Sequence, residues 1–189
     1  MIRVIAGIYK GRKLKYSKDS EIRPTSQLVK ESLFNIIGNE KIAGSYFLDG
    51  FCGTGAIGIE AISRGASYVA FIDNNEIAIR LLKENLNICE IKEGYEIIKM
   101  EFNRGVIELS KKGIFFDIVF IDPPYELLNF ADPLKTVWKR KILKKEGIAI
   151  VQHSSRINYT PKYFELIKKR VYGDTALSFF IQKEMVPSS

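Results

Sequence analysis

Residues 46–58 read YFLDGFCGTGAIG, an apolar run of strand length that leads directly into a glycine-rich loop. The run YFLD is the first of five segments of this kind, and the others lie at 68–73, 95–100, 116–122 and 147–152. All five are rich in β-branched or aromatic residues and are apolar over most of their length, which is typical of strands covered on both faces. We therefore expect a sheet with helices on both sides.

The segments between these strands are long enough for helices. They cover residues 56–64, 75–88, 102–112 and 126–140. Parallel strands need crossover connections, usually helical, and strict alternation of strand and helix is typical of α/β folds. The sequence therefore predicts a doubly wound, mostly parallel α/β sheet of the Rossmann-like kind.

The end of the chain departs from this alternation. Two strand candidates, 164–173 and 176–183, are separated only by a turn around Gly173-Asp174. So short a turn cannot hold a parallel crossover, so these strands are predicted to form an antiparallel hairpin at the edge of the sheet. No repeat or linker divides the chain, and we expect one domain over 1–189, with an appendage at 1–38 and the core at 45–189.

The start of the chain predicts a small basic unit. Strands at 2–9 and 12–16 are expected to form a hairpin that turns at Lys10-Gly11. Pro24 holds Arg23 extended, and Thr25 is the expected N-cap of a helix over 26–37 that ends at Gly38. The side of this helix expected to be buried carries Leu28, Leu33, Ile36 and Ile37.

The charge of the chain is concentrated at this end. The 189 residues carry a formal net charge of +7, and residues 1–30 hold eight Lys or Arg against two acidic residues. Such a local excess points to a polyanionic partner, and we expect phosphate contacts from this arm, with little sequence information in them. The candidate RNA-binding residues are Arg3, Lys10, Arg12, Lys13 and Arg23, with Lys15 and Lys18 beside them.

Other features narrow the class of protein. Cys52 and Cys89 make no disulfide framework and imply no metal site. No window approaches the roughly 18 consecutive apolar residues that a membrane helix needs. We expect a cytoplasmic protein without a membrane anchor.

The glycine loop predicts a nucleoside-binding site. Asp49 ends the first strand, Gly53, Gly55 and Gly58 follow it, and Asp73 ends the second strand 24 residues after Asp49. An acidic residue at that distance can bind both ribose hydroxyls. The spacing Gly-x-Gly-x-x-Gly also fits NAD, but a carboxylate ahead of the loop repels a pyrophosphate and attracts the cationic amino-acid end of S-adenosylmethionine (AdoMet). The residues therefore favour AdoMet.

The fourth strand is followed by Asp122-Pro123-Pro124-Tyr125. Methyl transfer to an exocyclic amine needs an acceptor that orients the amine, and Asp122 with a proline carbonyl can supply it. Two prolines stiffen the turn, and the ring of Tyr125 offers a face on which a planar base can stack. This motif predicts the pocket for a target base.

These motifs together resemble the RsmD family of bacterial class I AdoMet-dependent methyltransferases, which act on guanine N2 in small-subunit (16S) ribosomal RNA. The likeness is carried by RVIAGIYKGRKL (3–14), IRPTSQLVKESLFNII (22–37), FLDGFCGTGAIGIEAISRGA (47–66), FIDNN (71–75), FDIVFIDPPYE (116–126) and YGDTALSFF (172–180). It implies ribosomal RNA as the partner, either free or within an assembling small ribosomal subunit. We expect a monomer without a metal.

The resemblance also implies residue roles. Asp49, Gly53 and Gly55 would surround the methionine part of AdoMet, Asp73 would bind the ribose, and Asn74 would lie beside the adenine. At the end of the third strand, relatives tend to have an aspartate that meets the adenine amine. Glu101 or Asn103 takes that place here, with Glu101 favoured and Phe102 counted with the cofactor site. Gln152 stands where relatives often carry glutamate, so the resemblance assigns it no role.

Three other functions stay open on sequence alone. An adenine-N6 methyltransferase acting on DNA or RNA would use the same Asp-Pro-Pro-Tyr motif. An NAD-dependent oxidoreductase would use the glycine loop, and a non-catalytic RNA-binding assembly factor would keep only the fold. His153 is the only histidine, and we expect it to be a structural polar residue because methylation of an exocyclic amine needs no strong base.

Overall fold

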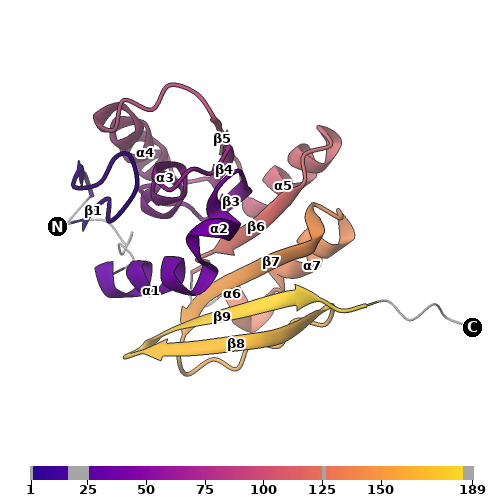
Figure 1. The fold of residues 1–189 in the computed structure, drawn as a ribbon. Helices are drawn as coiled ribbons and strands as arrows, with labels where there is room; N and C mark the ends of the chain where they lie inside the picture. Colours follow the sequence, from indigo (N-terminus) through magenta and orange to yellow (C-terminus); the bar gives the residue numbers. More distant parts are fainter. Residues whose placement is uncertain (1, 17–25, 125–126, 185–189) are drawn as a thin grey trace, which may run out of the picture.

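The computed structural model describes residues 2–16, 26–124 and 127–184, and it contains one large sheet (Figure 1). The strands are β3 (Tyr46–Gly50), β4 (Tyr68–Asp73), β5 (Tyr95–Lys99), β6 (Phe116–Ile121), β7 (Leu143–Ser154), β8 (Phe164–Tyr172) and β9 (Thr175–Gln182). Their order is β5-β4-β3-β6-β7-β9-β8. The first five are parallel, whereas β9 is antiparallel to both β7 and β8. The predicted mostly parallel sheet with an antiparallel edge hairpin is confirmed.

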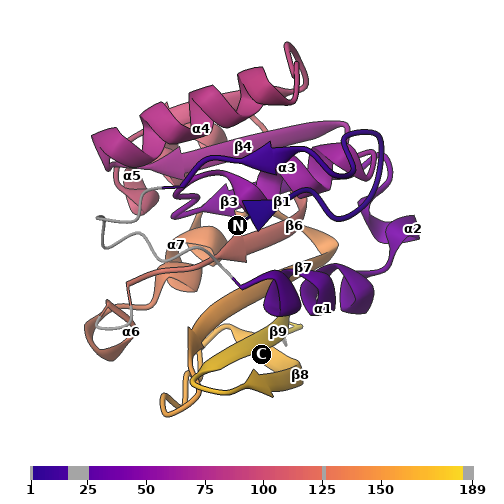
Figure 2. The ribbon, with the colours of Figure 1, turned by 90° about the vertical axis from the view of Figure 1, so that its left-hand side faces the viewer.

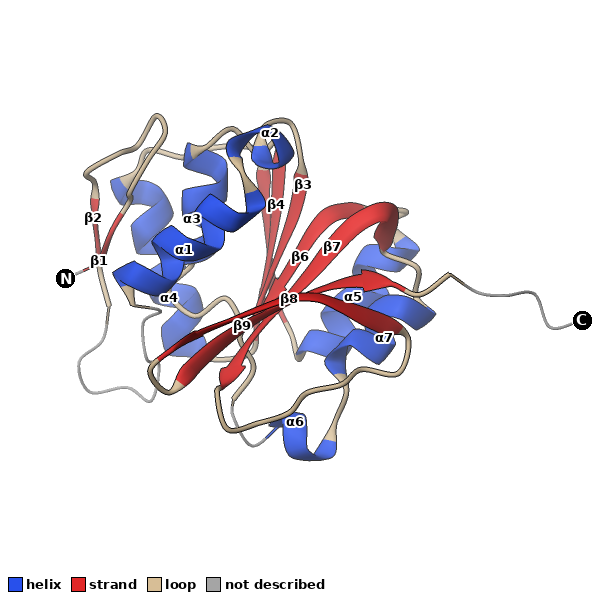
Figure 3. Cartoon of the chain, turned by 60° about the horizontal axis from the view of Figure 1, so that its bottom comes forward, coloured by secondary structure: helices blue, strands red, loops and turns tan. Residues whose placement is uncertain are grey.

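Helices cover both faces of this sheet (Figure 3). One layer contains α1 (Gln27–Ile37), α3 (Ala56–Ser63) and α4 (Glu76–Ile88), and the other contains α5 (Phe102–Lys111) and α7 (Pro133–Lys139). Successive strand residues point to opposite faces, so Phe47 packs in the core of the first layer and Leu48 in the core of the second. This explains why each strand is apolar over most of its length.

The segment 126–140, which is long enough for a crossover helix, contains two helices, α6 (Leu127–Phe130) and α7. The division lies at Asp132-Pro133. The side chain of Asp132 caps α7 by accepting a hydrogen bond from the backbone N–H of Lys135, and a proline disfavours helical conformation in the residue before it. A short helix, α2 (Asn39–Ile42), was not predicted.

The N-terminal strands are much shorter than predicted: β1 is Ile2–Arg3 and β2 is Lys13–Leu14. The intervening backbone bonds to α3, against which this segment lies (Figure 2). Glu60 accepts hydrogen bonds from the N–H groups of residues 5 and 6, and Ser63 Oγ accepts one from residue 9. The backbone pairing of the hairpin continues only to Val4, which bonds to Arg12 and Gly11, and beyond it side chains of α3 dock the segment on the core.

Helix α1 begins at Gln27, and its cap is Ser26, whose side chain accepts a hydrogen bond from Val29 N–H. The expected cap, Thr25, lies outside the described residues. The buried side also differs from the prediction, because Leu28 is 62% exposed whereas Lys30 is 1% exposed. Lys30 turns inward because its Nζ lies 3.2 Å from a carboxylate oxygen of Glu60.

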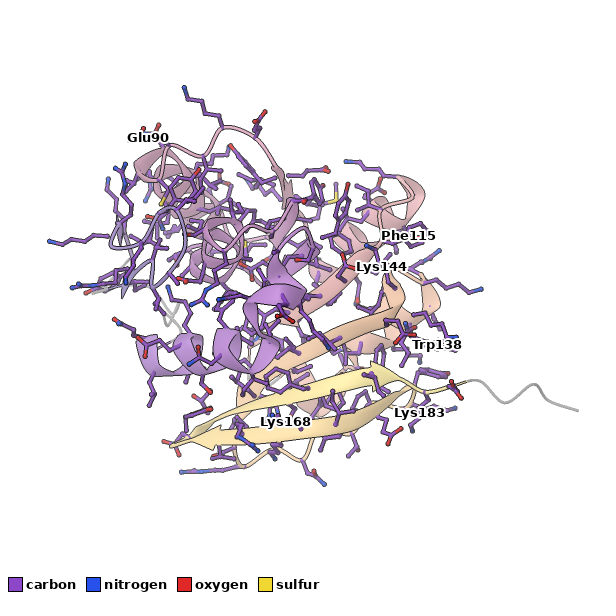
Figure 4. The ribbon with its side chains drawn as sticks, viewed as in Figure 1. Glu90, Phe115, Trp138, Lys144, Lys168 and Lys183 are labelled. Carbon is purple, nitrogen blue, oxygen red and sulfur yellow. The ribbon has the colours of Figure 1, made fainter. Side chains whose placement is uncertain are left out.

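Among the described strands, β8 forms the edge of the sheet and pairs only with β9. Its pairing register shifts between Leu166 and Lys168, and Leu166, Ile167 and Val171 are about half exposed. Lys168 lies on this strand, labelled in Figure 4. In the described part of the chain, no helix is long and apolar enough to span a membrane.

Candidate active site

The carboxyl ends of β3, β4 and β6 meet at one edge of the sheet, where β3 lies between the other two. The chain leaves β3 toward β4 on one side and returns as β6 on the other, which makes this the topological switch point where open α/β sheets bind ligands. Asp122 N–H donates to the carbonyl of Gly50 (3.2 Å), so the end of β6 is tied to the end of β3. Asp49, Asp73 and Asp122 are thereby brought together at one edge, as the sequence predicted.

The glycine loop joins β3 to α3 in a conformation that few residues can adopt. Gly55, the N-cap of α3, has φ of 76°, and a Cβ there would collide with the side chain of Leu82. Phe51 also has a positive φ of 58° without being glycine. It is held by its ring, which stacks on Phe102 with centroids 5.1 Å apart. Two contacts thus fix the loop: Gly55 packs against Leu82 of α4, and Phe51 stacks on Phe102 at the start of α5.

Asp49 is 1% exposed, and its Oδ2 accepts a hydrogen bond from Gly58 N–H (2.8 Å). Burial raises the pKa of Asp49 well above its usual value. The Gly58 bond opposes this rise, while the charges of Asp122 and Asp73 add to it. Asp49 therefore connects the end of β3 to the first turn of α3.

Asp73 is partly exposed at the end of β4. Its Oδ2 accepts a hydrogen bond from Gly53 N–H (2.8 Å), and its Oδ1 accepts one from Asn75 N–H (2.9 Å). Asn75 in turn caps α4 through its side chain, while Asn74 is exposed. Each carboxylate oxygen can accept a further bond, so Asp73 can both brace the loop and bind hydroxyl groups.

The end of β5 supplies the other candidates for the cofactor site. Glu101 is the exposed N-cap residue of α5 and makes no side-chain capping bond. It lines a surface hollow together with Lys99, Met100 and Arg104. Phe102 is buried, and Asn103 is exposed in the first turn of α5. Of the two candidates for the polar contact, Glu101 lies closer to the strand end.

Asp122 is partly buried, and its Oδ2 accepts a hydrogen bond from Gln152 Nε2 (2.8 Å). Removal from water raises the pKa of Asp122 to about 7, and the bond from Gln152 opposes this rise. Pro123 is buried, and the carbonyl of Pro124 accepts a hydrogen bond from Leu127 N–H (2.9 Å). Tyr125 lies outside the described residues.

His153 takes no part in this site. Its Nδ1 lies 2.8 Å from the carbonyl oxygen of Ser154, which requires a proton on Nδ1, and its Nε2 lies 2.8 Å from Ser178 Oγ. Burial lowers the pKa of His153. Both ring nitrogens are thus bonded within the β7–β9 pair, in agreement with the structural role expected for this residue.

The basic arm is in part neutralised by α4 and the turn after it. Arg12 forms an ion pair with Glu90 (3.0 Å), which Figure 4 labels at the end of α4, and Lys15 forms one with Glu84 (2.8 Å). Of the remaining candidates, Arg3, Lys10 and Lys13 are exposed, while Arg23 and Lys18 lie outside the described residues. Arg12 and Lys15, which the sequence placed among or beside the RNA-binding candidates, therefore also form ion pairs within the fold.

Sequence reasoning missed two buried polar centres. One is Glu60, which is fully buried and contacts Lys30 and Arg64. The other is the bond from Gln152 to Asp122. The run AIGIEAIS (56–63) gives a signal for Glu60, because an acid inside an otherwise apolar helix needs a partner when buried. In the described ranges, no group of His, Cys, Asp and Glu is placed to hold a metal ion.

Comparison with known proteins places this geometry in a family. The chain is 30% identical over 173 residues to ribosomal RNA small subunit methyltransferase D of Haemophilus influenzae, which covers 91% of this chain and 89% of that protein. It is 29% identical over 182 residues to the Escherichia coli K12 protein of the same name, covering 95% and 89%. Among solved structures, it is similar to hypothetical protein TTHA0928 of Thermus thermophilus, with a TM-score of 0.82, 27% identity and coverage of 97% and 100%.

A family model described as Conserved hypothetical protein 95 matches residues 2–181. The match includes the basic arm, the glycine loop, the Asp-Pro-Pro-Tyr motif and the closing hairpin. The chain therefore belongs to this family, which is the RsmD family that its motifs resemble.

Proposed function

We propose that this protein transfers a methyl group from AdoMet to the exocyclic N2 amine of a guanine in small-subunit ribosomal RNA. The names of its relatives support the reaction class and the RNA. The observation that carries the choice is Asp122, a partly buried carboxylate at the switch point, directly beside the glycine loop. A hydrogen-bond acceptor in that position suits an amine that must be oriented toward the cofactor.

The residues present fit AdoMet better than a dinucleotide. Asp49, Asp73 and Asp122 lie close enough for the charges of the last two to raise the pKa of the first. A cationic ligand relieves that repulsion, whereas a pyrophosphate increases it. Asp73 would hold the ribose, and the loop at Gly53 and Gly55 would surround the methionine part. When bound, AdoMet supplies an electrophilic methyl group on its sulfonium sulfur.

The protein then has to orient one nitrogen. Asp122 accepts a hydrogen bond from the N2 amine, which directs the nitrogen lone pair toward the methyl group. The carbonyl of Pro124 is already bonded to Leu127, so Pro123 is the better candidate for a second acceptor. The nitrogen gains positive charge as the new bond forms, and the carboxylate stabilises it. A carboxyl group with a pKa of about 7 can accept the released proton and lose it again at neutral pH.

We assign RNA contact to the exposed cations of the N-terminal arm. Lys10 and Lys13 are exposed, and the loop that carries them is fixed to α3 through Glu60 and Ser63. A docked arm can position RNA relative to α3, whose N-terminus borders the glycine loop. Phosphate contacts of this kind position a substrate without reading its sequence.

The test is methyl transfer from labelled AdoMet to ribosomal RNA from cells that lack this protein, followed by nucleoside analysis. We expect N2-methylguanosine in small-subunit RNA only. Label in N6-methyladenosine would support the adenine alternative, and no transfer to free RNA or to small-subunit particles would contradict an enzymatic role.

A further inference from the structure

Gln152 carries an amide oxygen that no described residue satisfies. The side chain is 6% exposed, its Nε2 donates to Asp122, and its Oε1 is buried without a hydrogen-bond partner. In the described ranges, only Ser45 Oγ shares this condition among side-chain atoms, and it lies before the start of β3, at the other end of the sheet. Leaving a buried amide oxygen without a donor is costly and uncommon in native proteins.

The nearest polar neighbours on the same strands do not supply the missing donor. Gln152 lies opposite Leu177 on β9, and the adjacent His153 has both ring nitrogens bonded to Ser154 and Ser178. A purely structural role for Gln152 explains the bond from Nε2 to Asp122. It does not explain why Oε1 is buried without a hydrogen-bond donor among the described residues. The oxygen therefore suits a donor that arrives with a ligand.

Asp122 also fixes which way the amide of Gln152 is turned. The oxygen and nitrogen of an amide share one carbon, so Oε1 lies beside the Asp122 carboxyl group while Nε2 bonds to it. Turning the amide over would place two oxygens against each other when Asp122 is ionised, which is unfavourable. Gln152 thus offers the site an acceptor and keeps its donor for Asp122.

The two acceptors, Gln152 Oε1 and the Asp122 carboxylate, match the donors on the Watson–Crick edge of guanine. On its Watson–Crick edge, guanine carries the N1–H donor next to the N2 amine, whereas adenine carries an acceptor at N1 next to its N6 amine. We propose that Gln152 Oε1 accepts the N1–H of the target guanine while Asp122 accepts from its N2 amine, which makes Gln152 a residue that selects guanine over adenine. This inference rests on the function proposed above and extends it to base selection.

The experiment uses a substrate that keeps the target amine but lacks the N1 hydrogen. The methylated guanine is first mapped, and 2-aminopurine is then placed at that position by RNA ligation. We expect the parent protein to show kcat/KM for guanine higher than that for 2-aminopurine by a factor on the order of 10–100, because an unpaired acceptor is left in the site. In Gln152→Met, which keeps the length of the side chain and removes the amide, this ratio should fall about tenfold below that of the parent.

Taking the ratio removes the other effects of the substitution. Loss of the Nε2 bond to Asp122 slows both substrates alike, and the missing O6 of 2-aminopurine affects the parent and the variant alike. Gln182→Met is the matched control, because the side chain of Gln182 donates to the carbonyls of Leu143 and Lys144 at the other end of β7 from Gln152. It should keep the parental ratio.

Two results would overturn the inference. One is a Gln152→Met variant that retains the parental ratio. The other is equal kcat/KM for guanine and 2-aminopurine in the parent protein. This second measurement does not depend on whether any variant folds. Failure of the proposed function looks different, because the parent would then give no N2-methylguanosine in the mapping step.

Discussion

Two carboxylates in this molecule are withdrawn from water but differ in how many donors and cations surround them. Glu60 accepts hydrogen bonds from two backbone N–H groups and contacts Lys30 (3.2 Å) and Arg64 (2.9 Å). Among the described residues, the Asp122 carboxylate accepts one side-chain hydrogen bond, from the uncharged amide of Gln152. A fully satisfied carboxylate holds its surroundings in place, whereas one with few donors retains capacity for a substrate. The difference separates a structural centre from the proposed catalytic one, although both are acidic residues in apolar sequence.

The strongest test of this comparison is the stability of Glu60→Ala. Removing the carboxylate leaves Lys30 and Arg64 buried without a counter-charge, and loss of one partner of a buried pair costs about 3–5 kcal/mol. We expect the free energy of unfolding in urea to fall by that amount. Lys30→Met should cost less, because Glu60 keeps Arg64 and its backbone donors. A larger loss for Lys30→Met would contradict the assignment of Glu60 as the centre.

The second test is the activity of Asp122→Ala, which should lower kcat by at least about 100-fold with little change in stability. AdoMet affinity by calorimetry should stay within a few-fold of the parent, since the side chain is assigned to the amine. Asp122→Asn keeps one acceptor but no charge and should fall between the two. Parental activity in Asp122→Ala would remove this residue from the mechanism.

The pH dependence of kcat/KM gives a third test, because it reports groups of the free enzyme. A carboxyl group with a raised pKa is protonated below that value and then cannot accept a bond from the amine. Activity should therefore rise about tenfold per pH unit below pH 7 and level off above it. In Gln152→Met the inflection should move to higher pH, because the bond that favours the carboxylate is lost. An inflection near pH 4 in the parent would mean that Asp122 is not desolvated as described.

The smallest effect is expected at the arm that the Glu60 centre holds. Replacing Lys10 and Lys13 by Gln should flatten the dependence of log K for RNA on log salt by about 0.7–0.9 for each side chain that meets a phosphate. Lys15→Gln is the control, because Lys15 already pairs with Glu84. Filter binding at several salt concentrations measures both. Equal salt dependence in the parent, the Lys10 and Lys13 variant and Lys15→Gln would mean that RNA does not contact this arm.

The order of the strands along the chain and their direction could be predicted from the sequence, because β3, β4 and β6 are short, mostly apolar runs separated by longer segments. Strand β7 begins at Leu143, before the predicted 147, because its first residues, Leu-Lys-Lys-Glu, lack that apolar pattern. The observed strand β6, Phe116–Ile121, differs from the expected 116–122 only at its end. The sequence also predicted that Asp49, Asp73 and Asp122 lie at one edge, since the carboxyl ends of parallel strands lie at the same edge of a sheet. Both results follow from local pattern and simple topology.

What the sequence did not reveal depends on contacts between distant segments. The exposure of Leu28 and the burial of Lys30 follow from Glu60, thirty residues further along, and no periodicity within α1 records that partner. The short N-terminal strands have the same cause, since Glu60 and Ser63 take the backbone donors that a longer hairpin would use. The bond between Gln152 and Asp122 likewise requires β6 and β7 to be neighbours.

The edge strand β8 has a consequence for solubility. An open strand edge offers unpaired backbone groups to any further strand, and exposed Ile167 and Val171 would favour such an addition. The register shift around Ile167 and the neighbouring cations Lys168, Lys169 and Arg170 oppose it, as bulges and lysines do on the edges of other natural sheets. These residues thus protect the folded chain from sheet-to-sheet aggregation, a role independent of any chemistry at the switch point.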